Sequence, residues 1–161
     1  ATPKDSLAHD IPAQHTVLVQ AEDTRITILV TWVASNRASE TLSARALWSR
    51  HSASARTSLQ TMVTKRVLRP LVFYLDGKPI KHTSLKTKIS TDPGRSGRIA
   101  AAILISIDLD PKAHRLDVHS ANDEPLRLKW LSKGATRVTS PSPPNRWQDK
   151  WHPLTLHWTS R

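Results

Sequence analysis

Short segments in which apolar residues alternate with other residues recur along the chain, and this pattern constrains the fold more than any other feature. The clearest case is Arg25–Val33, where every second residue from Ile26 to Trp32 is apolar and falls on one face of an extended strand. A second β-rich run, His15–Gln20, precedes it. The four polar or small residues between the two runs favour a β-hairpin.

Further strands are predicted along the rest of the chain, separated by turn residues. They are Leu71–Leu75, Ile80–Ser90, Arg98–Leu109, a strand around Leu116 and a strand around Leu128. Asp76-Gly77-Lys78-Pro79 predicts a tight turn, because Gly supplies the positive φ that such a turn needs. Seven short strands with turns between them predict a mainly β fold, an antiparallel β-sandwich of the immunoglobulin-like type.

The apolar period changes to that of a helix between residues 39 and 69. Ser39 is the expected N-cap of a helix that runs to about Arg50, and Ser54 that of a second helix to Leu68. Pro70 ends the second helix. Its buried stripe is expected to consist of Leu59, Met62, Val63 and Val67. The sandwich is therefore predicted to carry a helical-pair insertion at about 39–69.

Length and composition suit one domain with flanking segments, in a chain of 161 residues of which 38% are hydrophobic. Residues 1–14 show no periodicity and are expected to form an extended lead. Residues 15–138 form the sandwich domain with its insertion. Residues 139–161 combine a Pro/Ser linker with a Trp-rich C-terminal strand.

The chain is strongly basic, with a formal net charge of +11, and its positive charge is densest in the insertion. Between Glu40 and Asp76 there is no acidic residue, whereas six basic residues form a candidate patch: Arg45, Arg50, Arg56, Lys65, Arg66 and Arg69. Such a patch suits phosphates, anionic lipid or an acidic protein face. Single-strand binding usually stacks bases on several aromatic residues, and the insertion offers only Trp48.

Targeting is inferred from the start of the sequence. The only methionine is Met62, so Ala1 is not a translation start, and we expect an exported, periplasmic protein whose presequence has been removed. The longest apolar runs are far shorter than the ~20 residues of a membrane-spanning helix. The chain has no cysteine, which excludes disulfides and thiolate chemistry.

The order of these segments is a β-hairpin, a helical pair, a strand ending in Asp76-Gly77-Lys78-Pro79, and further strands. Over about His15–Leu131 it resembles exported bacterial β-sandwich domains such as the extracytoplasmic N-terminal region of HupE/UreJ-type membrane proteins. The resemblance implies a sandwich-like exported module of non-enzymatic character. Many such domains carry an Asp-rich calcium loop, but residues 41–75 contain no Asp or Glu, so no calcium site is expected.

Three groups of residues are candidates for chemistry, and each has a simpler interpretation. Asp117 and His119 share a strand face with Arg115, as on any half-exposed strand, and Asp108 with Asp110 ends a strand before a proline. The histidines His9, His15, His152 and His157 lack the spacing of a metal site. We therefore expect no metal, no cofactor and no catalytic residue.

The C-terminal segment is the candidate partner-binding element. Tryptophan is enriched at binding hot spots, and the segment contains Trp147, Trp151, Trp158, Leu154 and Leu156. Residues 154–159 alternate as one apolar-faced strand. That strand completes its own sheet or adds to the sheet edge of a partner, and the sequence leaves both interpretations open.

These features predict a non-catalytic accessory or scaffolding subunit that docks on a larger, membrane-associated protein assembly or on an anionic membrane surface. The alternative is a nucleic-acid-binding protein that uses the basic helical face. A small hydrolase or metal-binding protein is the third interpretation. No small-molecule substrate is evident from the sequence.

Overall fold

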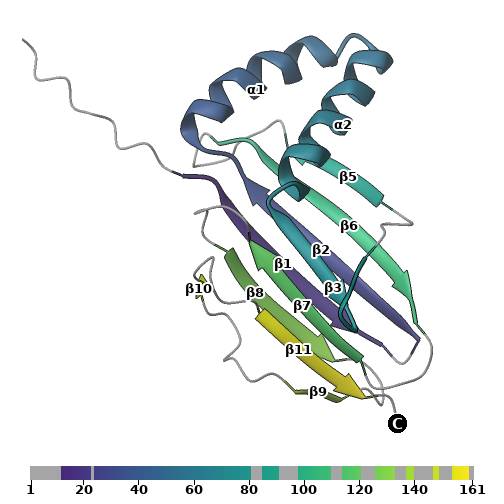
Figure 1. Ribbon diagram of the computed structural model, residues 1–161. Helices are drawn as coiled ribbons and strands as arrows, with labels where there is room; N and C mark the ends of the chain where they lie inside the picture. The colour runs from purple at the N-terminus through teal and green to yellow at the C-terminus, as the bar shows by residue number, and fades with distance from the viewer. Residues whose placement is uncertain are drawn as a thin grey trace, which may run out of the picture.

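The computed structural model describes residues 12–22, 24–80, 85–90, 98–109, 114–120, 126–132, 137–139, 147–148 and 154–159. Within these ranges the chain forms two β-sheets and two α-helices (Figure 1). The prediction of a mainly β, mainly antiparallel fold with a helical pair is confirmed.

The first sheet has six strands and is built around the predicted hairpin. Its strands, in spatial order, are β10 (Trp147–Gln148), β8 (Leu126–Ser132), β1 (Gln14–Ala21), β2 (Arg25–Val33), β6 (Ala100–Asp108) and β5 (Leu85–Ser90). β1 pairs along its whole length with β2, and the Glu22 N–H donates to the Arg25 carbonyl across the turn at 2.8 Å. The hairpin therefore lies in the middle of this sheet.

One strand pair departs from the antiparallel prediction. β8 runs parallel to β1, with His15 opposite Leu126 and Ala21 opposite Ser132. Parallel neighbours cannot be joined by a tight turn, and most of the chain separates these two strands. Alternation in the sequence indicates which face of β8 is apolar but not which strand lies beside it.

The second sheet has five strands and includes β11 (Leu154–Thr159), which lies near the C-terminal end of the chain. In spatial order its strands are β4 (Lys78–Pro79), β3 (Leu71–Leu75), β7 (His114–Ser120), β11 and β9 (Arg137–Thr139). The turn between β3 and β4 is confirmed, with φ of 79° at Gly77 and also a positive φ of 52° at Asp76. Of the return strand predicted at Ile80–Ser90, Leu85–Ser90 is a strand, β5, but it pairs with β6 in the other sheet, and β3 pairs instead with the short β4.

The helices are α1 (Asn36–Ser49) and α2 (Ala53–Leu68). Their N-caps are Ser35 and Ser52, not the predicted Ser39 and Ser54. Ser39 is buried inside α1, where its hydroxyl accepts a hydrogen bond from the Ile99 N–H at 3.0 Å. The predicted stripe of α2 is confirmed at its centre, with Leu59, Val63 and Val67 buried and Met62 half-buried.

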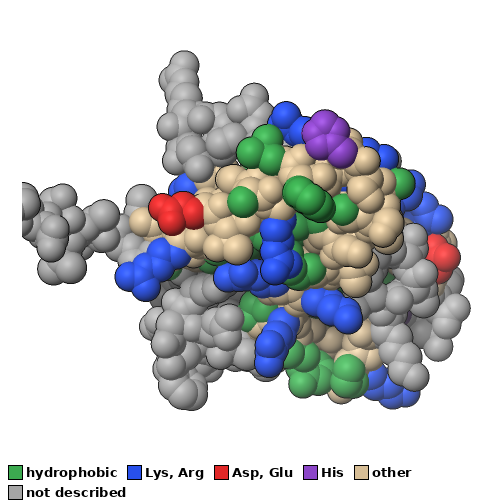
Figure 2. Space-filling view, turned by 90° about the horizontal axis from the view of Figure 1, so that it is seen from above, with side chains coloured by type: hydrophobic (Ala, Val, Ile, Leu, Met, Phe, Trp, Pro, Cys, Tyr) green, Lys and Arg blue, Asp and Glu red, His purple; other side chains and the backbone are tan. Residues whose placement is uncertain are grey.

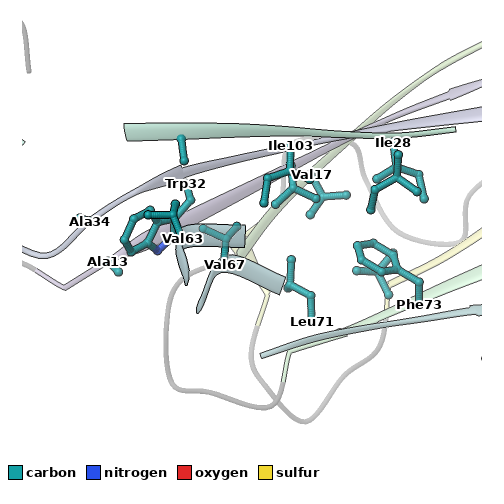
Figure 3. Close-up of a cluster of buried hydrophobic side chains, with 14 of the residues drawn as sticks. Ala13, Val17, Ile28, Trp32, Ala34, Val63, Val67, Leu71, Phe73 and Ile103 are labelled. Carbon is teal, nitrogen blue, oxygen red and sulfur yellow. The ribbon is translucent and has the colours of Figure 1, made fainter. Parts of the chain in front are cut away.

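The inner face of the first sheet is covered by two different partners (Figure 3). Ile28 of β2 faces Phe73 of the second sheet, while Trp32, near the end of the same strand, lies beside Val63 of α2. All of these side chains belong to one hydrophobic cluster. The second sheet thus covers one part of this face and the helices cover another. As predicted, one face of β2 is entirely buried, namely Ile26, Ile28, Val30 and Trp32.

Arg98 fixes the base of the helical pair to the first sheet. Its Nε donates to the Ala34 carbonyl and its Nη2 to the Pro12 carbonyl, both at 2.6 Å. The Ala34 N–H in turn donates to the Ile99 carbonyl at 2.9 Å. These bonds join the start of β1, the link into α1 and the start of β6, so α1 leaves the sheet from a fixed position.

Candidate functional site

The two helices form a hairpin, and the end of this hairpin remote from β3 is the candidate site (Figure 1). α1 ends at Ser49, and three residues later Ser52 caps α2 by accepting a hydrogen bond from the Ala55 N–H at 3.2 Å. We refer to residues 45–56 as the hairpin tip. The short connection holds the last turn of α1 and the first turn of α2 close together.

The hairpin tip exposes two large apolar side chains, Leu47 and Trp48, with exposed fractions of 57% and 77%. Among the described side chains, Leu104, with an exposed fraction of 38%, is the only other large hydrophobic one that is exposed. The two tip residues are exposed because an α-helix turns about 100° per residue, which places them off the inward-facing stripe of α1. That stripe consists of Ala38, Leu42, Ala46 and Ser49.

Sequence reasoning missed this pair as a site. Trp48 was considered only as the single aromatic residue of the insertion. The signal that identifies the pair is its register: once Leu42 and Ala46 are assigned to the buried stripe, positions 47 and 48 must face outward. Two adjacent, exposed large apolar residues on one helix are unusual on a protein that buries its other described tryptophan side chain, Trp32.

Three arginine residues belong to the same hairpin tip as the exposed pair. Arg45, Arg50 and Arg56 are all exposed and all belong to the hairpin tip. Arg56 Nη1 donates to the Arg50 carbonyl at 3.4 Å, and Arg45 Nη1 lies 2.9 Å from Met62 Sδ on α2. Among the described residues, no ion pair is formed by these three guanidinium groups, and residues 41–75 contain no carboxylate. The tip therefore combines exposed positive charge with two exposed apolar side chains.

The other half of the predicted basic patch lies elsewhere. Arg56 and Lys65 fall on opposite sides of α2, because nine residues correspond to two and a half helical turns. Lys65, Arg66 and Arg69 lie at the end of α2 that leads into β3, where the Arg66 guanidinium stands 5.9 Å from the ring centroid of Trp32. Figure 2, which looks down on the helices, shows Lys and Arg side chains scattered among hydrophobic ones. The six basic residues thus do not form one continuous helical face.

The structure places the predicted C-terminal anchors within the two sheets. Trp147 is in β10 and pairs with β8, whereas Leu154, Leu156 and Trp158 are in β11. β11 pairs with β7 on one side and with β9 on the other. Trp151 lies outside the described residues. The backbone of β11 thus belongs to its own domain, and the role of these residues as partner anchors stays a prediction.

The candidate catalytic carboxylates are engaged in ordinary surface ion pairs. Asp117 accepts from Arg115 Nε at 3.0 Å, and Asp108 accepts from Arg25 Nε at 3.2 Å. His15 is buried, with Nε2 3.0 Å from the Val67 carbonyl, where it links β1 to α2. Within the described ranges no group of three potential metal ligands comes together. Asp110, His9 and His152 lie outside the described residues, as do the side chains of His119 and His157.

Another bonded carboxylate is that of Asp76, in the turn between β3 and β4, and each of its two oxygens has a partner. Its Oδ2 lies 2.7 Å from His114 Nδ1, and its Oδ1 accepts from the Arg115 N–H at 2.9 Å. Burial alone would raise the pKa of the Asp76 carboxyl. The hydrogen bonds from His114 and Arg115, with the positive charge of both side chains, outweigh burial and lower this pKa below its usual range. The Asp76 carboxylate therefore holds the turn between β3 and β4 against β7, which is a structural role.

Asp76→Asn is expected to lower stability at neutral pH and to have little effect in acid. A carboxyl whose folded-state pKa is depressed stabilises the fold above its unfolded pKa of about 4, and this contribution is lost as pH falls through the folded value. Asn tolerates the positive φ of this position, so the loss is electrostatic, about 1 kcal/mol after solvent screening. Urea midpoints at pH 7 and pH 3 measure it. Asp108→Asn, which removes an exposed ion pair, is the control, and equal losses at both pH values would contradict the assignment.

Neither of the two described helices is long and apolar enough to cross a membrane. Among the described side chains, we base a functional assignment on the exposed pair Leu47 and Trp48 and on the arginines of the hairpin tip. Comparison with protein-family models and with curated proteins identified no match to this chain.

Proposed function

We propose that the protein is a non-catalytic docking subunit of a larger, membrane-associated assembly, and that the hairpin tip is its contact surface. The observation that carries this proposal is the exposure of Leu47 and Trp48 side by side on one helix. Burial of a Trp side chain on a partner is worth about 3 kcal/mol. The arginines of the hairpin tip favour encounter with an acidic surface and fix its orientation.

We propose in addition that the two sheets form an immunoglobulin-like β-sandwich interrupted by the helical hairpin. The support is the single hydrophobic cluster to which the buried faces of both sheets contribute. In this arrangement the sandwich is a rigid support, and the hairpin is the element that differs from a plain sandwich. The function is accordingly assigned to the hairpin.

Nucleic-acid binding is the second candidate. Trp48 is an exposed aromatic residue beside three arginines, and such a pair of features can stack a base and contact phosphate. The separation of the six basic residues into two groups gives this function less support than a continuous strip would. A retained single-stranded oligonucleotide whose affinity falls steeply with salt would favour it.

Trp48→Ala is expected to release the partner. The full chain is purified under native conditions, the co-purifying assembly is identified, and its affinity is measured for the parent chain and two variants. Loss of about 3 kcal/mol corresponds to a roughly hundred-fold weaker complex. Leu104→Ala, on β6, removes another exposed hydrophobic side chain and is the matched control. An assembly that binds the Trp48→Ala variant as tightly as the parent chain would contradict the proposal.

A further inference from the structure

The hairpin tip is a convex feature carried on a rigid base. Figure 1 shows α1 and α2 extending above the strands, with their connection at the far end of the hairpin. The buried stripes of both helices belong to the main hydrophobic cluster, through residues such as Leu42 and Val63. The tip is therefore held in a fixed position, and it presents its exposed side chains outward.

The chemistry of the tip is that of a membrane-interface anchor. Trp and Leu side chains partition into the boundary between headgroups and acyl chains, and arginines beside them contact lipid phosphates. Leu47 and Trp48 are about 100° apart around α1, so together they cover a broad apolar sector. Residues 41–75 contain no carboxylate, and the one carboxylate on the two helices, Glu40, lies in the first half of α1, outside the hairpin tip.

This combination favours a lipid surface over the other anionic partners. Bases stack on aromatic faces, and the exposed Leu47 provides none. An acidic protein would need a cavity shaped for a protruding Trp and Leu, whereas a bilayer accepts a convex apolar element without a preformed cavity. Charge complementarity to anionic headgroups comes from Arg45, Arg50 and Arg56, which are exposed around the same two turns.

We infer that the hairpin tip binds the surface of an anionic bilayer. Leu47 and Trp48 enter the interface, and Arg45, Arg50 and Arg56 lie against lipid phosphates. This inference rests on the proposed docking function and names the surface that the tip contacts within the membrane-associated assembly. The sheets stay outside the bilayer and hold the tip against it.

The test is co-sedimentation of the full chain with extruded vesicles in 0.1 M salt. Vesicles of phosphatidylcholine mixed with phosphatidylglycerol are compared with vesicles of phosphatidylcholine alone. Binding is expected only to the anionic vesicles, because each arginine near the surface contributes about five-fold in affinity. Trp48→Ala is expected to weaken binding about ten-fold or more, whereas Leu104→Ala changes it less than two-fold.

A charge-matched comparison separates the tip from the general attraction of a basic protein. Arg50→Gln with Arg56→Gln removes two positive charges at the tip. Lys86→Gln with Lys88→Gln removes two exposed positive charges from strand β5. The tip variant is expected to bind more than ten-fold more weakly and the β5 variant less than three-fold, since attraction falls off beyond a Debye length of about 10 Å. Equal losses would overturn the inference.

A label reports the position of the tip without relying on substitutions that weaken binding. The chain contains no cysteine, so Leu47→Cys provides a single site for an environment-sensitive fluorophore. Its emission is expected to shift to the blue on anionic vesicles, while the same label at Leu104→Cys stays in water. Circular dichroism first establishes that each variant is folded. A label at position 47 that stays in water on bound vesicles would overturn the inference even if every substitution weakened binding.

The outcomes distinguish this inference from the proposed function. If vesicles are not bound, but a protein assembly still co-purifies and is lost with Trp48→Ala, the lipid inference is wrong and the docking function stands. If vesicles are bound through the tip and Trp48→Ala leaves the co-purifying assembly intact, the assembly docks elsewhere and the proposed function is wrong. A single-stranded oligonucleotide that displaces the protein from vesicles at lower concentration than lipid would overturn the inference in favour of nucleic acid.

Discussion

Deletion of residues 145–161 is expected to unfold the protein, not to release a free tail. The deletion removes β10 and β11. β11 lies between β7 and β9, and its Leu154 and Leu156 stand opposite Val118 and Leu116 of β7. Those two β7 side chains are fully buried. Removal of β11 exposes these two side chains and leaves the β7 backbone unpaired on that side. It also leaves β9 without the strand with which it pairs.

The measurement is thermal unfolding followed by circular dichroism. The shortened chain is expected to lose the cooperative transition, because total stabilities are only about 5–15 kcal/mol and a whole strand is removed. A synthetic peptide of residues 145–161 serves as the control and is expected to restore the transition when added. If the shortened chain melted at the temperature of the parent chain, β11 would be peripheral, and the C-terminal tryptophans would again be available as anchors for a partner.

Trp32→Ala is expected to destabilise the protein by about 3–5 kcal/mol, the largest effect of any single substitution proposed for this chain. Trp32 is 2% exposed and lies where β2 meets the helical hairpin. Its removal leaves a cavity next to Val63 and also abolishes the contact with the Arg66 guanidinium, worth up to about 1 kcal/mol. In a chain of this size the loss corresponds to a fall in melting temperature of roughly 6–20 °C.

Trp48→Ala is the matched control for this prediction, because it makes the same change on the exposed side of the hairpin. Its expected effect on stability is within about 0.5 kcal/mol. The two tryptophans thus divide their roles: Trp32 maintains the fold and Trp48 is available for binding. A large loss of stability with Trp48→Ala would show that its side chain packs in solution, and would remove the basis of the docking proposal.

Local features of the fold could be predicted from the sequence, and long-range ones could not. The hairpin of β1 and β2 follows from alternation and a short polar connection, both within twenty residues. The start of α1 was misplaced because the Ser39 hydroxyl bonds to Ile99, a partner that no local pattern identifies. The parallel pairing of β8 with β1 and the separation of β4 from β5 depend on the same kind of distant contact.

The candidate site shows the same limit in a different way. Composition identified the insertion as the most basic region, and that property follows directly from the sequence. Composition could not show that Arg56 and Lys65 lie on opposite sides of α2, because their relative orientation depends on where the helix begins and ends. The exposure of Leu47 and Trp48 could have been derived once the buried stripe of α1 was assigned. Which of the two tryptophans, Trp32 or Trp48, is buried therefore depends on register and not on residue type.

The pairing of β8 with β1 also has a consequence for how the protein is made. β1 is synthesised long before β8. The backbone hydrogen-bonding groups on one edge of β1 therefore have no strand partner while most of the remaining chain is synthesised. Pairings between strands so distant in sequence fold slowly, and an open strand edge invites association with other chains in the interval. We therefore expect a newly made molecule to be prone to aggregation until its last third has been synthesised, and heat-denatured protein to aggregate unless it is refolded at low concentration.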